Sequence, residues 1–165
     1  MLITKPRFET FAEYLQYEDN SEGLYELFNG ELIEMPPESG LNYQIANRLF
    51  LVFALMLGTD RIRGHGLELE VRGEPKNRYP DLTIIREEHI KPGEIQRERD
   101  YIAKRIQYQD CGIPEYWIVD PQTQTILVLE LRGNTYTEIG NFSNDDLVKS
   151  SIFNQLNIKV SQVFN

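Results

Sequence analysis

The chain is poor in the residues that build disulfide frameworks and His/Cys metal clusters. Its 165 residues include one cysteine, Cys111, and two histidines. A single cysteine excludes an intrachain disulfide and a cysteine-based metal cluster. The longest apolar run, residues 49–57, is too short to span a bilayer, so we expect a buried helix there and no membrane partner. The N-terminal residues contain no apolar secretory segment, and we therefore expect a cytoplasmic protein.

Basic residues are in the minority, with 17 Lys and Arg against 26 Asp and Glu and a formal net charge of −9. This balance excludes a protein that coats nucleic acid with its whole surface. The charge is unevenly distributed, because residues 1–40 carry −7, residues 106–165 carry −4 and residues 41–105 carry +2. Twelve of the 17 basic residues lie in that middle stretch. The distribution is compatible with a local anion-binding surface on an acidic protein.

The apolar content is ample for a folded core, since 41% of the residues are hydrophobic and 18 are aromatic. The length predicts a single domain spanning residues 1–165. Apolar residues at helical spacing predict an N-terminal helix over residues 8–15. Asn29-Gly30 between residues 24–28 and 31–35 predicts a β-hairpin with a type I′ turn. Ser39 and Gly58 are suited to begin and end a helix over residues 41–57.

Further along the chain, alternation and β-branched residues predict strands at residues 67–72, 79–85, 114–120, 124–131 and 135–139. The strand at residues 114–120 is mostly apolar, which is typical of a strand inside a sheet. A charged segment, residues 86–105, passes into a helix that ends at Cys111-Gly112. The pattern does not assign residues 158–164. Together these elements predict a mixed α/β or α+β domain.

Phosphate-binding, dinucleotide-binding and serine-nucleophile motifs are all missing from the sequence. The most informative cluster is Asp81, which stands at the start of a strand after an acidic strand with Glu68 and Glu70 and before a basic helix. Phosphodiester hydrolysis needs a hard cation held by oxygen ligands, and a lysine can orient the water. The plainer interpretation is that Asp81 caps a turn and that Lys104 pairs with an acid on its own helix. Chemistry alone favours the plainer interpretation.

Three stretches of the sequence, residues 25–35, 78–86 and 99–121, resemble the Uma2 (DUF820) family, which is related to the PD-(D/E)XK nuclease superfamily. The resemblance covers nearly the whole chain. It implies a restriction-endonuclease-like fold, in which a mixed central sheet lies between helices, together with a metal site for DNA cleavage. On the family pattern, Asp81 matches the metal-binding aspartate and Lys104 matches the lysine displaced onto the following helix.

The sequence departs from the family pattern in two places. Asn42 stands where the family usually has a histidine, and the strand that carries the family's second metal carboxylate is missing between Ile85 and Pro92. Three explanations compete: the strand is lost together with most activity, Glu88 replaces the missing acid, or the sequence omits a segment of the gene product. We favour the omission, because losing a central strand of about 5–6 residues would leave a hole in the core.

These observations lead to one hypothesis and two rivals. The hypothesis is a DNA endonuclease that uses Mg²⁺ or another divalent cation, with Asp81 as metal ligand and Lys104 as its catalytic partner. Glu88 and Glu70, or Glu68 beside it, are further candidate ligands. The rivals are a nuclease-fold protein that binds nucleic acid without cutting it, and a structural or dimerisation module. By analogy with enzymes that cut both strands with two sites, we also expect a homodimer.

Overall fold

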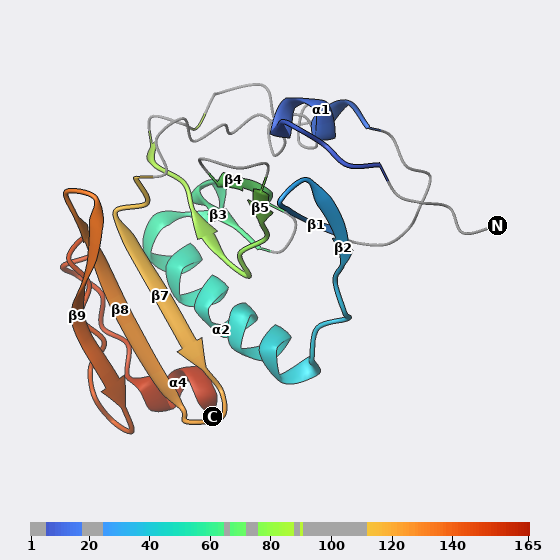
Figure 1. Cartoon of the computed structure of the whole chain (residues 1–165). Coiled ribbons are helices and arrows are strands. Elements are labelled where there is room, and N and C mark those ends of the chain that lie inside the picture. The colour runs from blue at the N-terminus through green and yellow to red at the C-terminus, as the bar shows by residue number, and fades with distance from the viewer. Residues whose placement is uncertain (1–5, 18–24, 65–66, 72–75, 88–89, 91–111) are drawn as a thin grey trace. The chain divides into compact units, whose positions relative to one another are not determined.

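The computed structural model describes residues 6–17, 25–64, 67–71, 76–87, 90 and 112–165, except for the side chains of residues 70, 71 and 76. The described chain is a mixed α+β structure with antiparallel strand pairing, as predicted (Figure 1). Its elements are α1 (Phe11–Gln16), β1 (Tyr25–Phe28), β2 (Glu31–Glu34), α2 (Gly40–Leu57), η1 (Thr59–Arg61), β3 (Ile62–Arg63), β4 (Leu69–Val71), β5 (Lys76–Arg78), β6 (Thr83–Ile84), β7 (Glu115–Asp120), β8 (Thr125–Arg132), β9 (Thr135–Ser143) and α4 (Val160–Phe164).

The chain forms two compact units, and α2 contributes to both. One consists of residues 1–38 and 53–111, and the other of residues 39–52 and 112–165. A single domain over residues 1–165 therefore stays a prediction, and each unit is described by itself.

The N-terminal helix begins where a side chain can cap it. The Thr10 side chain accepts a hydrogen bond from Glu13 N at 3.2 Å, so α1 starts at Phe11 and Phe8 precedes the helix. Phe8, Phe11 and Leu27 are buried together in one cluster of the first unit. The helix prediction is confirmed with a shifted start, because capping chemistry sets the boundary whereas apolar spacing does not.

The β1–β2 hairpin has the predicted register and turn. Asn29 and Gly30 have φ angles of 51° and 80°, and Leu27 stands opposite Leu32. Phe8 N donates a hydrogen bond to Gly30 O at 2.8 Å, which ties the N-terminal segment to the turn. A Cβ atom on Gly30 would collide with the Phe8 carbonyl oxygen, so the turn needs glycine for space as well as for its backbone angle.

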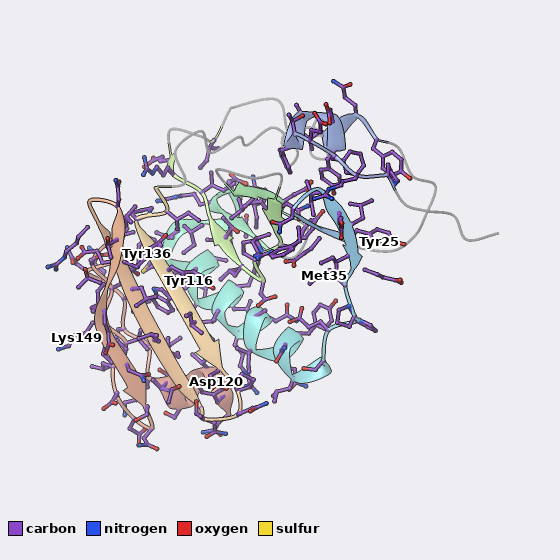
Figure 2. All side chains as sticks on the ribbon, viewed as in Figure 1. Tyr25, Met35, Tyr116, Asp120, Tyr136 and Lys149 are labelled. Carbon is purple, nitrogen blue, oxygen red and sulfur yellow. The ribbon has the colours of Figure 1, made fainter. Side chains whose placement is uncertain are left out.

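The second unit is built on the β7–β8–β9 sheet. Ile126 and Val128 of β8 are fully buried on one face. On the other face, Tyr116 and Tyr136 lie beside each other (Figure 2), with ring centroids 6.2 Å apart, and both are exposed. Within the described residues, β7 pairs only with β8, and its position inside a sheet stays a prediction.

Glu115, at the start of β7, anchors the loop that follows β9. Its carboxylate accepts hydrogen bonds from Ser150 Oγ at 2.8 Å, Ser151 N at 2.7 Å and Ser151 Oγ at 2.9 Å. It also accepts one at 2.7 Å from Nε1 of Trp117, the only tryptophan of the chain. These bonds satisfy the carboxylate within the second unit, so Glu115 has a structural role there.

Helix α2 has the predicted ends. Ser39 Oγ accepts a hydrogen bond from Asn42 N at 3.2 Å, and Gly58, with φ of 83°, donates through its N–H to Ala54 O at 2.9 Å. In the second unit, Arg48 Nη1 donates to Val163 O at 2.9 Å, which attaches α4 to this helix. Val163 is itself fully buried.

The second half of α2 is less buried than the sequence predicts. Phe53 is 3% exposed, but Leu51 is 61% and Leu55 is 89% exposed, so the prediction of a buried helix is wrong for these leucines. With 18 residues and a mean hydropathy of 1.2, α2 is long and apolar enough to cross a membrane by length and composition alone. A core helix of a soluble protein passes the same test, so this is weak evidence for a span.

Candidate functional site

Asp81 lies at an interruption between two short antiparallel ladders of the first unit. Strands β4 and β5 pair with Leu69 opposite Arg78, and strands β3 and β6 pair with Arg63 opposite Thr83. The two ladders are separate two-stranded sheets, and residues 79–82 connect β5 of one to β6 of the other.

The sequence predicts one uninterrupted strand over residues 79–85, and the structure corrects this to a break between β5 and β6. The break contains Pro80 and Asp81, and Asp81 forms a bend. Proline has no N–H to donate to a ladder, so pairing stops there. The Asp81 side chain is exposed at the break, where a ligand can reach it.

Directly after this break, Thr83 carries a buried hydroxyl group that lacks a partner. Thr83 Oγ1 has almost no solvent-accessible surface, and it has no hydrogen-bond partner among the described residues. Burying a hydroxyl without a partner costs about 1–3 kcal/mol. Few native groups are left in this state, and an ion or water that completes the site is a common reason.

A network of buried polar side chains includes Asn77 of β5, the strand that precedes Asp81. Glu68 is only 5% exposed and Asn77 is fully buried. Asn77 Nδ2 donates a hydrogen bond to Glu68 Oε1, and Asn77 Oδ1 accepts one from Leu27 N at 2.5 Å. Asn77 thereby links β5 to β1 and satisfies a buried carboxylate at the same time. Glu68 is consequently held in the interior, a role that the prediction of a candidate metal ligand does not include.

Two tyrosines complete the network. Tyr14 Oη and Tyr79 Oη are 3.3 Å apart. Burial raises the pKa of Tyr14 to about 12, and the charge of Glu68 adds to this effect. Burial also raises the pKa of Tyr79, with contributions from Tyr14 and Glu68. Both phenols are therefore neutral at physiological pH and act as hydrogen-bonding groups.

Positive charge gathers along the β3–β6 ladder beside Asp81. Arg61 Nε donates to Ile85 O at 3.1 Å, and Ile85 N donates to Arg61 O at 2.8 Å. Arg63 stands opposite Thr83 and is exposed, as is Arg86 after β6. Exposed arginines can form charge-assisted hydrogen bonds with phosphate.

The other predicted site residues are only partly covered by the structure. Glu70 stands opposite Asn77 in the β4–β5 ladder, and its side chain is not among those described. Glu88 and Lys104 lie outside the described residues, as do residues 89 and 91 of the segment where the family's acidic strand is missing. The roles of Glu70, Glu88 and Lys104 therefore stay predictions.

Asp81 is the one described carboxylate of the segment between β5 and β6 that a divalent cation could use. Magnesium prefers carboxylate oxygens and keeps several waters, which need hydrogen-bond acceptors or donors around them. Asp81 offers one exposed carboxylate, whereas the Thr83 hydroxyl is covered by protein and no water reaches it in this structure. In the described part of the chain, no cluster of three or more His, Cys, Asp or Glu side chains could hold a metal without help.

Sequence reasoning missed Asn77 and Thr83. Asn77 stands between two basic residues in a stretch that resembles a polar turn, and Thr83 is an ordinary β-branched strand residue. The only available signal is the spacing of two residues that Asn77, Tyr79, Asp81 and Thr83 share, which would place them on one face of a strand. This spacing does not reveal which of the four side chains are buried.

Comparisons with known proteins bear on the whole chain. A search of curated proteins finds no match to the chain. Among solved structures, a "putative nuclease belonging to DUF820" from Anabaena variabilis ATCC 29413 is similar over 94% of this chain and 97% of its own, with 18% sequence identity and a TM-score of 0.68. At this identity the likeness shows a common fold.

The model of one protein family, described as "Putative restriction endonuclease", matches residues 11–100 and 94–161. The match consists of two parts that overlap at residues 94–100, just after the stretch where the family's acidic strand is missing. Because these two parts together span most of the sequence, the chain belongs to the Uma2 family.

Proposed function

We propose that this protein is a Mg²⁺-dependent endonuclease that hydrolyses phosphodiester bonds of DNA. Membership of a family described as restriction endonucleases and the fold shared with a DUF820 protein support a nuclease. The observation that carries the finer proposal is the exposed position of Asp81, the residue that matches the family's metal-binding aspartate, at a break between two ladders.

In this proposal Asp81 is a metal ligand. A bound divalent cation supplies an activated water and offsets negative charge on the phosphate. Arg61, Arg63 and Arg86 attract the phosphate backbone, which explains how a protein with a net charge of −9 can act on DNA locally. Lys104 directs the water or the phosphate, and Glu88 or Glu70 adds a second carboxylate.

A plasmid-nicking assay with Mg²⁺ tests the proposal. We expect Asp81→Ala to lower the nicking rate by at least about 100-fold, because losing a metal ligand removes both water activation and charge compensation. Glu34→Ala is the matched control, since Glu34 is an exposed acid of the same unit on β2, a strand that contributes no residue to the proposed site. Equal nicking by the wild type and Asp81→Ala would refute the assignment of Asp81.

DNA-binding measurements on the same wild-type protein separate the two rival functions. DNA binding that weakens as salt rises, without any cleavage, would indicate a nuclease-fold protein that only binds nucleic acid. No DNA binding at any salt concentration would leave a structural or dimerisation role. Sedimentation at several protein concentrations tests the proposed homodimer, and fractionation of cells tests the proposed cytoplasmic location.

A further inference from the structure

Two arginines of the first unit, Arg61 and Arg63, hold their guanidinium groups on backbone carbonyls and not on carboxylates. Arg61 Nε donates a hydrogen bond to Ile85 O at 3.1 Å. Arg63 Nη1 donates to Asp60 O and to Ile62 O, both at 2.9 Å. Neutral carbonyls fix both side chains without compensating their charge. Each guanidinium group also keeps N–H donors that these bonds do not use.

Other arginines in the described part of the first unit pair with acids. Arg7 Nη1 lies 3.8 Å from Glu31 Oε1, and Arg78 Nη1 lies 3.2 Å from Glu26 Oε2. For the two carbonyl-held arginines, no ion pair with a carboxylate occurs among the described residues. Two fixed guanidinium groups whose charge is not compensated attract an anion with several acceptor oxygens, and phosphate matches their fork geometry.

The hydrogen bonds also place the two groups along the β3–β6 ladder. Arg63 stands opposite Thr83, the ladder residue that is nearest to Asp81 in the sequence. Its guanidinium group, however, turns back to carbonyls at the start of β3, and that of Arg61 lies at Ile85 O on the opposite strand. Both groups are therefore held at the end of the ladder that is farther from Asp81. Ile85 follows Asp81 by four residues, so their Cα atoms are at most about 14 Å apart.

We propose that Arg61 and Arg63 form an arginine clamp, which binds a backbone phosphate of the nucleic acid beside the one that is cleaved at Asp81. This inference rests on the proposed function, since it takes the substrate to be nucleic acid. It replaces a general attraction by hydrogen bonds from two guanidinium groups to the oxygens of one phosphate. The arginine clamp works without a metal ion, so it contributes to the binding of DNA and not to the chemical step.

Fluorescence anisotropy of a labelled short DNA duplex in EDTA measures this contact without metal, on the full chain. We expect Arg61→Gln/Arg63→Gln to bind DNA about 10-fold or more weakly, and the slope of log affinity against log salt to fall by about one. Arg61→Lys/Arg63→Lys keeps the charge but loses the fork, so its affinity should fall by about threefold or more. Arg7→Gln is the matched control, because Glu31 already pairs with this arginine, and its affinity should stay within about twofold of the wild type.

Nicking kinetics with Mg²⁺ locate the contact relative to the phosphate that reacts. In Arg61→Gln/Arg63→Gln the DNA concentration for half-maximal nicking should rise about 10-fold, and most of the loss should appear there and not in the maximal rate. Far-UV circular dichroism verifies that each variant is folded. Arg63→Gln alone replaces the double variant if that variant unfolds, because the Arg61 side chain joins the two strands of the ladder whereas the Arg63 side chain bonds only within its own segment.

Each other outcome overturns a defined part of the argument. If the glutamine variant binds DNA like the wild type, the arginine clamp is wrong. If the lysine variant binds like the wild type and the glutamine variant binds weakly, the arginines only attract DNA, and the clamp is wrong as well. If the maximal rate falls at an unchanged half-maximal concentration, the arginines act on the phosphate that reacts, and the neighbouring position is wrong. In these cases nicking that depends on Asp81 leaves the endonuclease standing, whereas a wild type that neither binds nor nicks DNA refutes the proposed function itself.

Discussion

Replacing Asn77 by alanine should destabilise the first unit strongly. The substitution removes two hydrogen bonds of a fully buried side chain, one to Glu68 Oε1 and one from Leu27 N. It leaves a backbone N–H and a carboxylate without these partners in the interior. A buried group that loses its partner costs about 1–3 kcal/mol, and the cost is higher when the group is charged.

The expected total follows from these two groups. With about 1–2 kcal/mol for Leu27 N–H and about 2–3 kcal/mol for Glu68, Asn77→Ala should lower the free energy of unfolding by about 3–5 kcal/mol. For a urea m-value of about 2 kcal/mol/M, the midpoint should fall by about 1.5–2.5 M. Glu68→Gln keeps an acceptor oxygen at this place and should cost much less.

Urea unfolding followed by far-UV circular dichroism measures the effect. Asn154→Ala is a control, because Asn154 is exposed and should change the free energy of unfolding by less than about 0.5 kcal/mol. A double-mutant cycle of Asn77→Leu and Glu68→Leu should give a coupling energy of at least about 1 kcal/mol. A loss below about 1 kcal/mol for Asn77→Ala, or zero coupling, would show that the network does not hold the strands together.

Three further changes test other parts of the structure. The pKa of Tyr14 rises from 10 to about 12 on folding, so the stability that the neutral phenol contributes is complete below pH 10 and is lost between pH 10 and 12. Urea unfolding at several pH values should show a smaller loss of stability over this range in Tyr14→Phe than in the wild type. Gly30→Ala should destabilise by more than Gly133→Ala, since only Gly30 would place a Cβ against backbone, and equal thermal shifts would contradict the collision. Glu115→Gln should lower the free energy of unfolding by about 1.5–3 kcal/mol, and it should change the fluorescence of Trp117, whose indole N–H donates a hydrogen bond to the Glu115 carboxylate. Unchanged Trp117 emission and an unchanged urea midpoint would argue against this role of Glu115.

Local elements were largely predictable from the sequence. The Asn29-Gly30 turn depends on two backbone angles that few other residues adopt, and the ends of α2 depend on Ser39 and Gly58. Each of these features is decided by residues within a few positions of one another. For the same reason α1 and the strands of the second unit are found near their predicted places, although β9 runs on to Ser143.

The candidate site was predictable only in part. The family resemblance indicated Asp81, and the structure places it at an exposed break that residues 79–85 do not reveal. Alternation over residues 67–72 separates Leu67 and Leu69 from Glu68, yet all three are buried, because both faces of this segment are covered. A period of two in the sequence identifies two faces but does not say how many of them meet protein.

The sequence by itself therefore determined the mixed α+β class, the hairpin, the limits of α2 and the aspartate of the family motif. The tertiary structure alone decided that Glu68 is an interior residue held by Asn77, that the strand breaks at Asp81, and that the Thr83 hydroxyl lacks a partner among the described residues. The physical reason is distance along the chain: a turn or a cap is a local interaction. The burial of a polar group depends on a partner such as Leu27, which is 50 residues away from Asn77.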